Sequence, residues 1–155
     1  MTDHTDPTRR AAWLRVLARA TPDELAAHAS PVLADYRFEW LRAPEPGLVM
    51  VRARIGNTGD RFNLGEATVT RCAVRLRLDG DAMVAGVGHV MGLDSPRAER
   101  IAQLDALLQV DALHALLWRT VVEPLRSLDE QRGRDERART EASRVRFFAL
   151  RPEAA

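Results

Sequence analysis

The sequence predicts an α+β fold, in which a four-stranded antiparallel sheet is flanked by N-terminal and C-terminal helices. Apolar residues recur at helical spacing in 8–35, alternate with polar residues through much of 36–92, and return to helical spacing in 95–150. Because helices precede and follow one run of strands, we expect them to pack on one face of the sheet. A chain of 155 residues is long enough for one core, so the prediction is a single domain spanning 1–155.

Two helices are expected before the sheet. Trp13 and Leu17 lie on one side of the first helix, opposite most of its arginines. Thr21 should cap the second helix, where Pro22 fits the first helical position and Glu24 completes a capping box. After the sheet, the segment that begins at Ser95-Pro96 carries one long apolar stripe, so it should cover the sheet until Pro124 ends or kinks it. This stripe contains Ile101, Leu104, Leu108 and Ala112.

The four strands are expected at 36–42, 48–55, 66–78 and 83–91, and they should form a meander. The proline-rich residues 43–47 should separate the first two strands. Alternation then predicts which side chains face the core. They are Tyr36, Phe38, Trp40, Val49, Val51, Ile55, Cys72, Val74 and Leu76, with part of Met83–Met91.

The two central strands also carry a stripe of arginines. Arg52 and Arg54 alternate with the apolar residues of 48–55, while Arg71, Arg75 and Arg77 alternate with those of 66–78. If these strands pair, the five arginines share one basic face. Such a face suits a partner surface or an anionic ligand.

The segment 56–65 between these strands is longer than the two-residue connections that hairpins favour. It contains Gly59, Arg61, Asn63 and Gly65, all of which are candidate ligand-binding or partner-binding residues. Its glycines could present bare backbone N–H groups to an anion. Alternatively, they only shape the turn.

No nucleophile elbow, phosphate-binding loop or dinucleotide fingerprint is present in the sequence. Two residues are weak catalytic candidates. Glu66 could act as a base or pair with a nearby arginine at a rim, and His89 could be catalytic or a structural histidine of an apolar strand. Asp105 and Gln109, four residues apart on a helix, could reach into a site or brace a loop.

The composition excludes several other classes of function. The lone Cys72, expected in the core, allows no internal disulfide, and the four scattered histidines offer no zinc spacing, so we expect no metal or cofactor bound by this chain alone. A net charge of +1 argues against nucleic-acid binding. No apolar run reaches the roughly 18 residues of a membrane span, and the polar N-terminus lacks a secretory signal, which predicts a cytoplasmic protein.

The C-terminal segment is rich in charge and cannot bury itself well. Apolar residues are few after Arg126 until Val145, Phe147 and Phe148. The adjacent phenylalanines near a chain end predict an anchor on another surface.

Several blocks of the sequence resemble the PhnG family, whose members are small subunits of the bacterial carbon–phosphorus lyase core complex. The most specific block is Phe62-Asn63-Leu64-Gly65-Glu66-Ala67-Thr68-Val69-Thr70-Arg71. Further similarity lies in Trp13-Leu14, 16–18, 47–52, 105–109, 142–145 and Phe147-Phe148.

The resemblance implies a hetero-oligomer with PhnH, PhnI and PhnJ, and a functional link to PhnL. It implies that the complex forms alpha-D-ribose 1-methylphosphonate 5-triphosphate from ATP and methylphosphonate during phosphonate catabolism. In that case ATP is a substrate of the complex and this chain is a non-catalytic or accessory subunit. The alternative from the residues alone is a free-standing binder of triphosphate or another anion through the basic sheet face.

Overall fold

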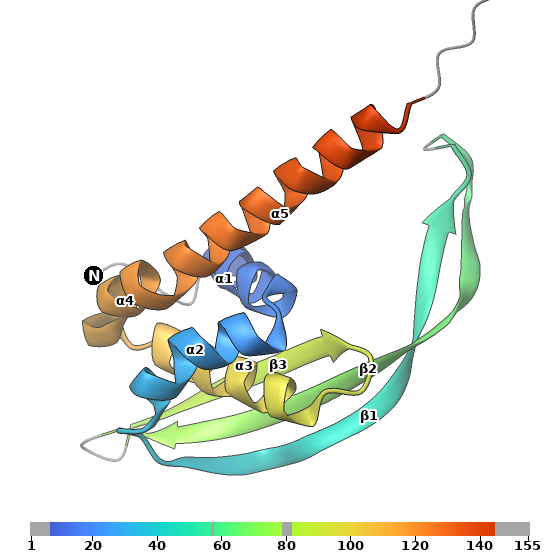
Figure 1. Ribbon diagram of the computed structural model, residues 1–155. Coiled ribbons are helices and arrows are strands. Elements are labelled where there is room, and N and C mark those ends of the chain that lie inside the picture. Colours follow the sequence, from blue (N-terminus) through green and yellow to red (C-terminus); the bar gives the residue numbers. More distant parts are fainter. Residues whose placement is uncertain (1–6, 57, 79–81, 145–155) are drawn as a thin grey trace, which may run out of the picture.

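A computed structural model describes residues 7–56, 58–78 and 82–144 of the chain. Helices cover one face of a curved sheet, and the hairpin of the first two strands extends well beyond them (Figure 1). The longest helix, α5, projects on the same side as this hairpin (Figure 1). In chain order the elements are α1 (Pro7–Arg19), α2 (Pro22–Leu33), β1 (Phe38–Arg54), β2 (Arg61–Arg77), β3 (Met83–Met91), α3 (Ser95–Leu108), α4 (Asp111–Leu117), the π-helix η2 (Trp118–Val122) and α5 (Glu123–Ala142).

The α+β class agrees with the expectation from sequence, but the prediction of a four-stranded sheet was wrong. The described residues form three strands in the order β1-β2-β3, with both pairs antiparallel. The two strands expected at 36–42 and 48–55 are one strand, because residues 43–47 do not break it. β1 lies at the sheet edge, where proline is tolerated, and the pairing with β2 shifts register between Trp40 and Arg42 and again between Arg42 and Glu45.

The core lies between the helices and the face of the sheet that they cover, which we call the inner face. Cys72, Val74 and Leu76 of β2 point into it, as their alternation predicts. On the helical side, Trp13, Ile101, Leu104 and Leu108 are buried. Ala112, expected on the same stripe, is exposed, because the predicted long helix is interrupted after Leu108 and Ala112 lies on α4. The Thr21 side chain accepts a hydrogen bond from the Glu24 N–H, and the Glu24 carboxylate accepts one from the Thr21 N–H, so the predicted capping box is confirmed.

Two glycines of β3 let α3 pack directly on the sheet backbone. A Cβ atom on Gly86 would lie 2.0 Å from the carbonyl oxygen of Ala102, and one on Gly88 would lie 1.9 Å from that of Ala98. Both separations are far inside van der Waals contact. Glycine at both positions is therefore a condition for the α3–β3 contact.

Asp105 and Gln109 attach α3 to the free edge of β3. The buried Asp105 carboxylate accepts hydrogen bonds from the backbone N–H of Val87 at 2.8 Å and from Trp13 Nε1 at 2.9 Å. It also pairs with Arg10, whose Nη2 lies 2.6 Å from Oδ2. The Gln109 amide donates to the Ala85 carbonyl at 2.9 Å. These residues thus brace a strand edge, where the sequence suggested a site or a loop.

Pro124 does not end the helical segment, because α5 begins at Glu123 and continues to Ala142. The chain passes from α4 through the π-helix η2 into α5, and the N–H of Glu123 bonds to the carbonyl of Trp118, five residues earlier. This wider turn lies immediately before the proline, which has no N–H of its own to donate.

Candidate interaction surface

The hairpin of β1 and β2 forms a protruding arm, which we define as residues 48–68. β3 pairs with β2 only from Val69 onward, so the arm is a two-stranded ribbon. Many of its large apolar side chains are exposed, with Ile55 76% and Leu48 and Leu64 each 63% accessible. An isolated two-stranded ribbon is marginal in water, and exposed apolar patches mark interaction surfaces. The full exposed set is Leu48, Val49, Met50, Ile55, Phe62 and Leu64.

The sequence block predicted as a long loop is mostly strand. β2 already begins at Arg61, so the connection between the strands is much shorter than 56–65. Gly56 has φ +59°, a conformation that glycine adopts readily, whereas the N–H of Gly59 is used in a hydrogen bond to the Ile55 carbonyl at 3.2 Å. The nest of free N–H groups therefore loses one of its expected members, and residue 57 lies outside the described residues.

A bulge in β2 changes which side chains share a face. Val51 pairs with Gly65, but its neighbour Arg52 pairs with Asn63, so Leu64 is an extra residue in β2. Gly65 adopts φ +154° beside it. Because this extra residue reverses the alternation of β2, Arg61 and Asn63 lie on the inner face. Arg52 and Arg54 lie there because Leu48 and Met50, on their side of β1, pair with Thr68 and Glu66, which share a face of β2 with Cys72, so the expected basic face of five arginines does not form.

The register of β1 on β2 also shows that the prediction of Val49, Val51 and Ile55 as core residues was wrong. Val49 and Val51 occupy the same face of β1 as Glu45, which pairs with Arg71 on the outer face of the sheet. They therefore do not join Cys72 in the core. Ile55 is exposed, as is Trp40, whose indole N–H bonds to Glu99 at the margin of α3.

The outer-face arginines are engaged in ion pairs. Arg71 lies 3.1 Å from Glu45, which also approaches Arg42 at 3.6 Å. Arg75 pairs with Glu39, and Arg77 lies 3.7 Å from the same carboxylate. The hydrogen bond from Arg75 is the main cause that lowers the pKa of Glu39. Arg71 and Arg75, predicted as ligand or partner residues, are therefore already partnered within the chain.

The inner-face arginines of the arm have no such partners. None of the ion pairs or side-chain hydrogen bonds formed within the described part of the chain includes Arg52, Arg54 or Arg61. Arg54 lies directly opposite Arg61, and Arg52 lies opposite Asn63. The three arginines and Ala53 line a hollow of about 320 Å³. Arg52, Arg54, Arg61 and Asn63 are therefore the predicted site residues that the structure brings together.

The two weak catalytic candidates do not meet. Glu66 pairs with Met50 on the inner face of the arm, whereas His89 pairs with Arg71 on the outer face, and both side chains are exposed. Phe147 and Phe148, the predicted anchor, lie outside the described residues.

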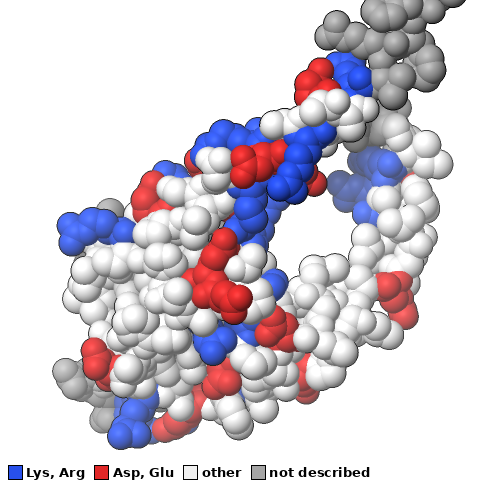
Figure 2. All heavy atoms as spheres, viewed as in Figure 1, with Lys and Arg blue, Asp and Glu red and all other residues white. Residues whose placement is uncertain are grey.

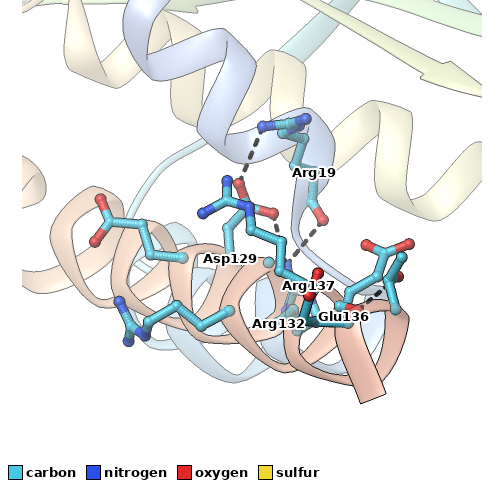
Figure 3. A pocket seen from close by; sticks show the side chains of 10 residues that line it. Arg19, Asp129, Arg132, Glu136 and Arg137 are labelled. Carbon is cyan, nitrogen blue, oxygen red and sulfur yellow. Dashed lines mark hydrogen bonds and ion pairs between the residues drawn. The ribbon is translucent and has the colours of Figure 1, made fainter. Parts of the chain in front are cut away.

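Sequence reasoning did not single out two further hollows among the helices. One, of about 1010 Å³, runs along α5, where Arg132 bonds to the Arg19 carbonyl at 3.2 Å and Asp129 pairs with the Arg19 guanidinium at 3.3 Å (Figure 3). The other, of about 460 Å³, is lined by Arg9, Ala12, His114, Ala115 and Trp118. The Arg19–Asp129 ion pair and the hydrogen bond from Arg132 to the Arg19 carbonyl hold α5 against the end of α1, so these three residues have a structural role.

Comparison with known proteins identifies the family. Residues 8–151 match the family model described as phosphonate metabolism protein PhnG. The chain belongs to the PhnG family. A relative from Rhizobium meliloti (strain 1021) is 38% identical over 148 residues, which cover 96% of this chain and 92% of the relative. That protein is named alpha-D-ribose 1-methylphosphonate 5-triphosphate synthase subunit PhnG. The resemblance found in the sequence is thus confirmed, and the arm contains residues 62–68 of its most specific block.

Two further properties of this PhnG family member concern membranes and metals. Among the described residues, no helix is both long and apolar enough to cross a membrane. In the same part of the chain, no group of three or more His, Cys, Asp or Glu side chains is arranged to hold a metal ion.

Proposed function

We propose that this chain is an accessory subunit of alpha-D-ribose 1-methylphosphonate 5-triphosphate synthase, and that its arm docks onto the other subunits. Family membership supports the assignment, since the relative carries that subunit name. The observation that carries the docking role is the arm itself, a two-stranded ribbon with exposed apolar side chains. PhnH, PhnI and PhnJ are the proposed partners in the cytoplasm, with PhnL as a functional partner.

The energetics of the arm support a protein interface. Burying a large aliphatic or aromatic side chain is worth about 1.5–3 kcal/mol. The exposed apolar residues of the arm together offer on the order of 10 kcal/mol before the cost of association is subtracted. Such a gain would also stabilise the ribbon, which has no third strand along residues 61–67.

The accessory role is supported by the separation of the candidate acid–base residues. General acid–base catalysis needs groups within hydrogen-bond reach of the same substrate atoms. Glu66 and His89 lie on opposite faces of the sheet, so they cannot serve one bound substrate together. In this proposal the reacting groups come from the partner subunits, and ATP is a substrate of the whole complex.

Co-purification tests this proposal. The chain is co-expressed with PhnI, PhnJ and an affinity-tagged PhnH, once unchanged and once with Ile55→Ser and Leu64→Ser. We expect the arm variant to be lost from the purified complex. Leu116→Ser on α4, which alters a side chain of similar exposure far from the arm, should leave recovery unchanged. Equal recovery of the arm variant and the unchanged chain would refute docking through the arm.

A further inference from the structure

Arg52, Arg54 and Arg61 on the inner face of the arm repel one another, and no carboxylate of the described residues forms an ion pair with them. Arg54 and Arg61 are direct register partners, and like charges directly opposite in an antiparallel pair are destabilising. Within the described arm strands, Glu66 is the only acidic residue on this face. It lies opposite Met50 in the register and forms no ion pair with these arginines. The outer-face arginines, by contrast, each have a glutamate partner.

The inner face of the arm borders an opening in the molecule. In Figure 2 this opening separates the arm from α5, and basic side chains appear on both of its sides. The arginine-lined hollow on the arm is shallow and composed of exposed strand residues. A small anion is usually held by convergent donors in an enclosed pocket, whereas an open basic face suits a longer acidic chain.

The backbone of the arm favours an extended occupant. β1 is an edge strand, and β2 has no neighbour on its other side along residues 61–67, so both edges of the ribbon can accept an added strand. Leu48 and Met50, on the same face as Arg52, are exposed and add apolar contact area. A second copy of the chain fits poorly there, because it would bring arginines against arginines.

We propose that the inner face of the arm binds an acidic, extended segment of a partner subunit, whose carboxylates pair with Arg52, Arg54 and Arg61. This inference rests on the proposed function, since it requires a partner subunit. It goes beyond that function by naming the chemistry of the docked segment and the face that receives it. The segment also supplies the missing counter-charges for Arg54 and Arg61.

A matched pair of triple variants tests the proposal. Arg52, Arg54 and Arg61 are changed to Gln in one chain, and Arg71, Arg75 and Arg77 are changed to Gln in the other, so the change in net charge is the same. Each purified chain is titrated against the purified complex of the other subunits at low and high salt. We expect the inner-face variant to bind on the order of 10-fold more weakly at low salt and to lose most of the salt dependence. The outer-face variant should retain both properties.

Equal affinity and equal salt dependence for the inner-face variant and the unchanged chain would overturn the proposal while leaving the proposed function intact. Failure of the unchanged chain to bind the other subunits would overturn both. A photo-crosslinking residue placed at Asn63 in the assembled complex should attach to a partner segment rich in Asp and Glu. Attachment to a segment without acidic residues would contradict the proposal.

A second measurement separates the acidic segment from a phosphate ligand. The isolated chain and its inner-face variant are titrated with tripolyphosphate by calorimetry. We expect no saturable heat for either chain, because the three arginines lie on an open strand surface. A saturable signal that disappears in the inner-face variant would replace the acidic segment with a triphosphate ligand.

Discussion

Gly88 of β3 lies so close to Ala98 of α3 that a Cβ atom on the glycine would come 1.9 Å from the alanine carbonyl oxygen. This contact places the helix directly on the edge strand of the sheet. The position of α3 in turn fixes the polar contacts of Asp105 and Gln109 with β3.

Gly88→Ala should therefore destabilise the fold by about 3 kcal/mol, because α3 must move away from the sheet to admit the methyl group. Gly133→Ala is the matched control, since nothing lies within 4 Å of its added Cβ in the middle of α5. The control should gain about 0.5–1 kcal/mol through helix propensity. Urea unfolding of both variants measures the difference. Equal effects would contradict direct packing of α3 on β3.

Asp105→Ala should destabilise the chain by about 3 kcal/mol, because Arg10 and the N–H groups of Trp13 and Val87 lose their shared acceptor in the core. Asp135→Ala removes an exposed carboxylate of α5 that accepts from Gln131, and it should change stability by less than about 0.5 kcal/mol. Thermal or urea unfolding distinguishes the two. A small effect at Asp105 would show that this carboxylate does not hold the helices to β3.

The Cys72 thiol should resist modification in the folded protein. Burial, with a smaller contribution from Glu99, raises the pKa of this thiol to about 11, so little thiolate is present at neutral pH. We expect slow reaction with a thiol reagent near pH 8 and complete reaction after unfolding in urea. Because the folded pKa is raised, the contribution of Cys72 to stability is present below the unfolded pKa and is lost as the pH rises toward 11. Rapid modification of the native chain would refute the burial of β2 under α3.

Glu24 should make stability sensitive to acid. Burial raises its pKa, but hydrogen bonds from Thr21 and Arg132 outweigh burial, and the net pKa is lowered from 4.5. A lowered folded pKa means that the contribution is present above the unfolded pKa and is lost as the pH falls through the folded one. Glu24→Gln retains an acceptor for the cap but lacks the charge, so its stability should fall less steeply between about pH 5 and pH 3. Identical pH profiles would show that the Arg132 pair contributes nothing.

The sequence predicted the parts of the fold that depend on local pattern. The core residues of β2, the buried stripe of α3 and the capping box at Thr21 follow from alternation, helical spacing and capping chemistry. The strand count failed at residues 43–47, where Pro44 and Pro46 looked like breakers. Whether proline breaks a strand depends on whether its missing N–H was needed, and on the edge strand β1 it was not.

The candidate site was predicted only in part, because faces of a sheet depend on register. Arg52, Arg54, Arg61 and Asn63 do lie together, but the register of β1 on β2 places Arg52 and Arg54 on the face opposite Arg71, and the extra residue Leu64 brings Arg61 and Asn63 to their side. Alternation alone cannot reveal a bulge. Alternation also cannot distinguish an apolar side chain that packs in the core of its own chain from one on an exposed interaction surface. Val49 and Ile55 were therefore expected in the core, although they are exposed.

The docking role of the arm is tested most directly by removing it. Residues 49–67 are replaced by Asn-Gly, which joins the register partners Leu48 and Thr68 through a two-residue hairpin turn. The core pairing of β1 and β2 and all helices remain, so circular dichroism should show a cooperatively folded chain. We predict that this chain is absent from the complex purified with PhnH, PhnI and PhnJ, while the full chain is recovered with it. Recovery of the shortened chain at the level of the full chain would contradict the account.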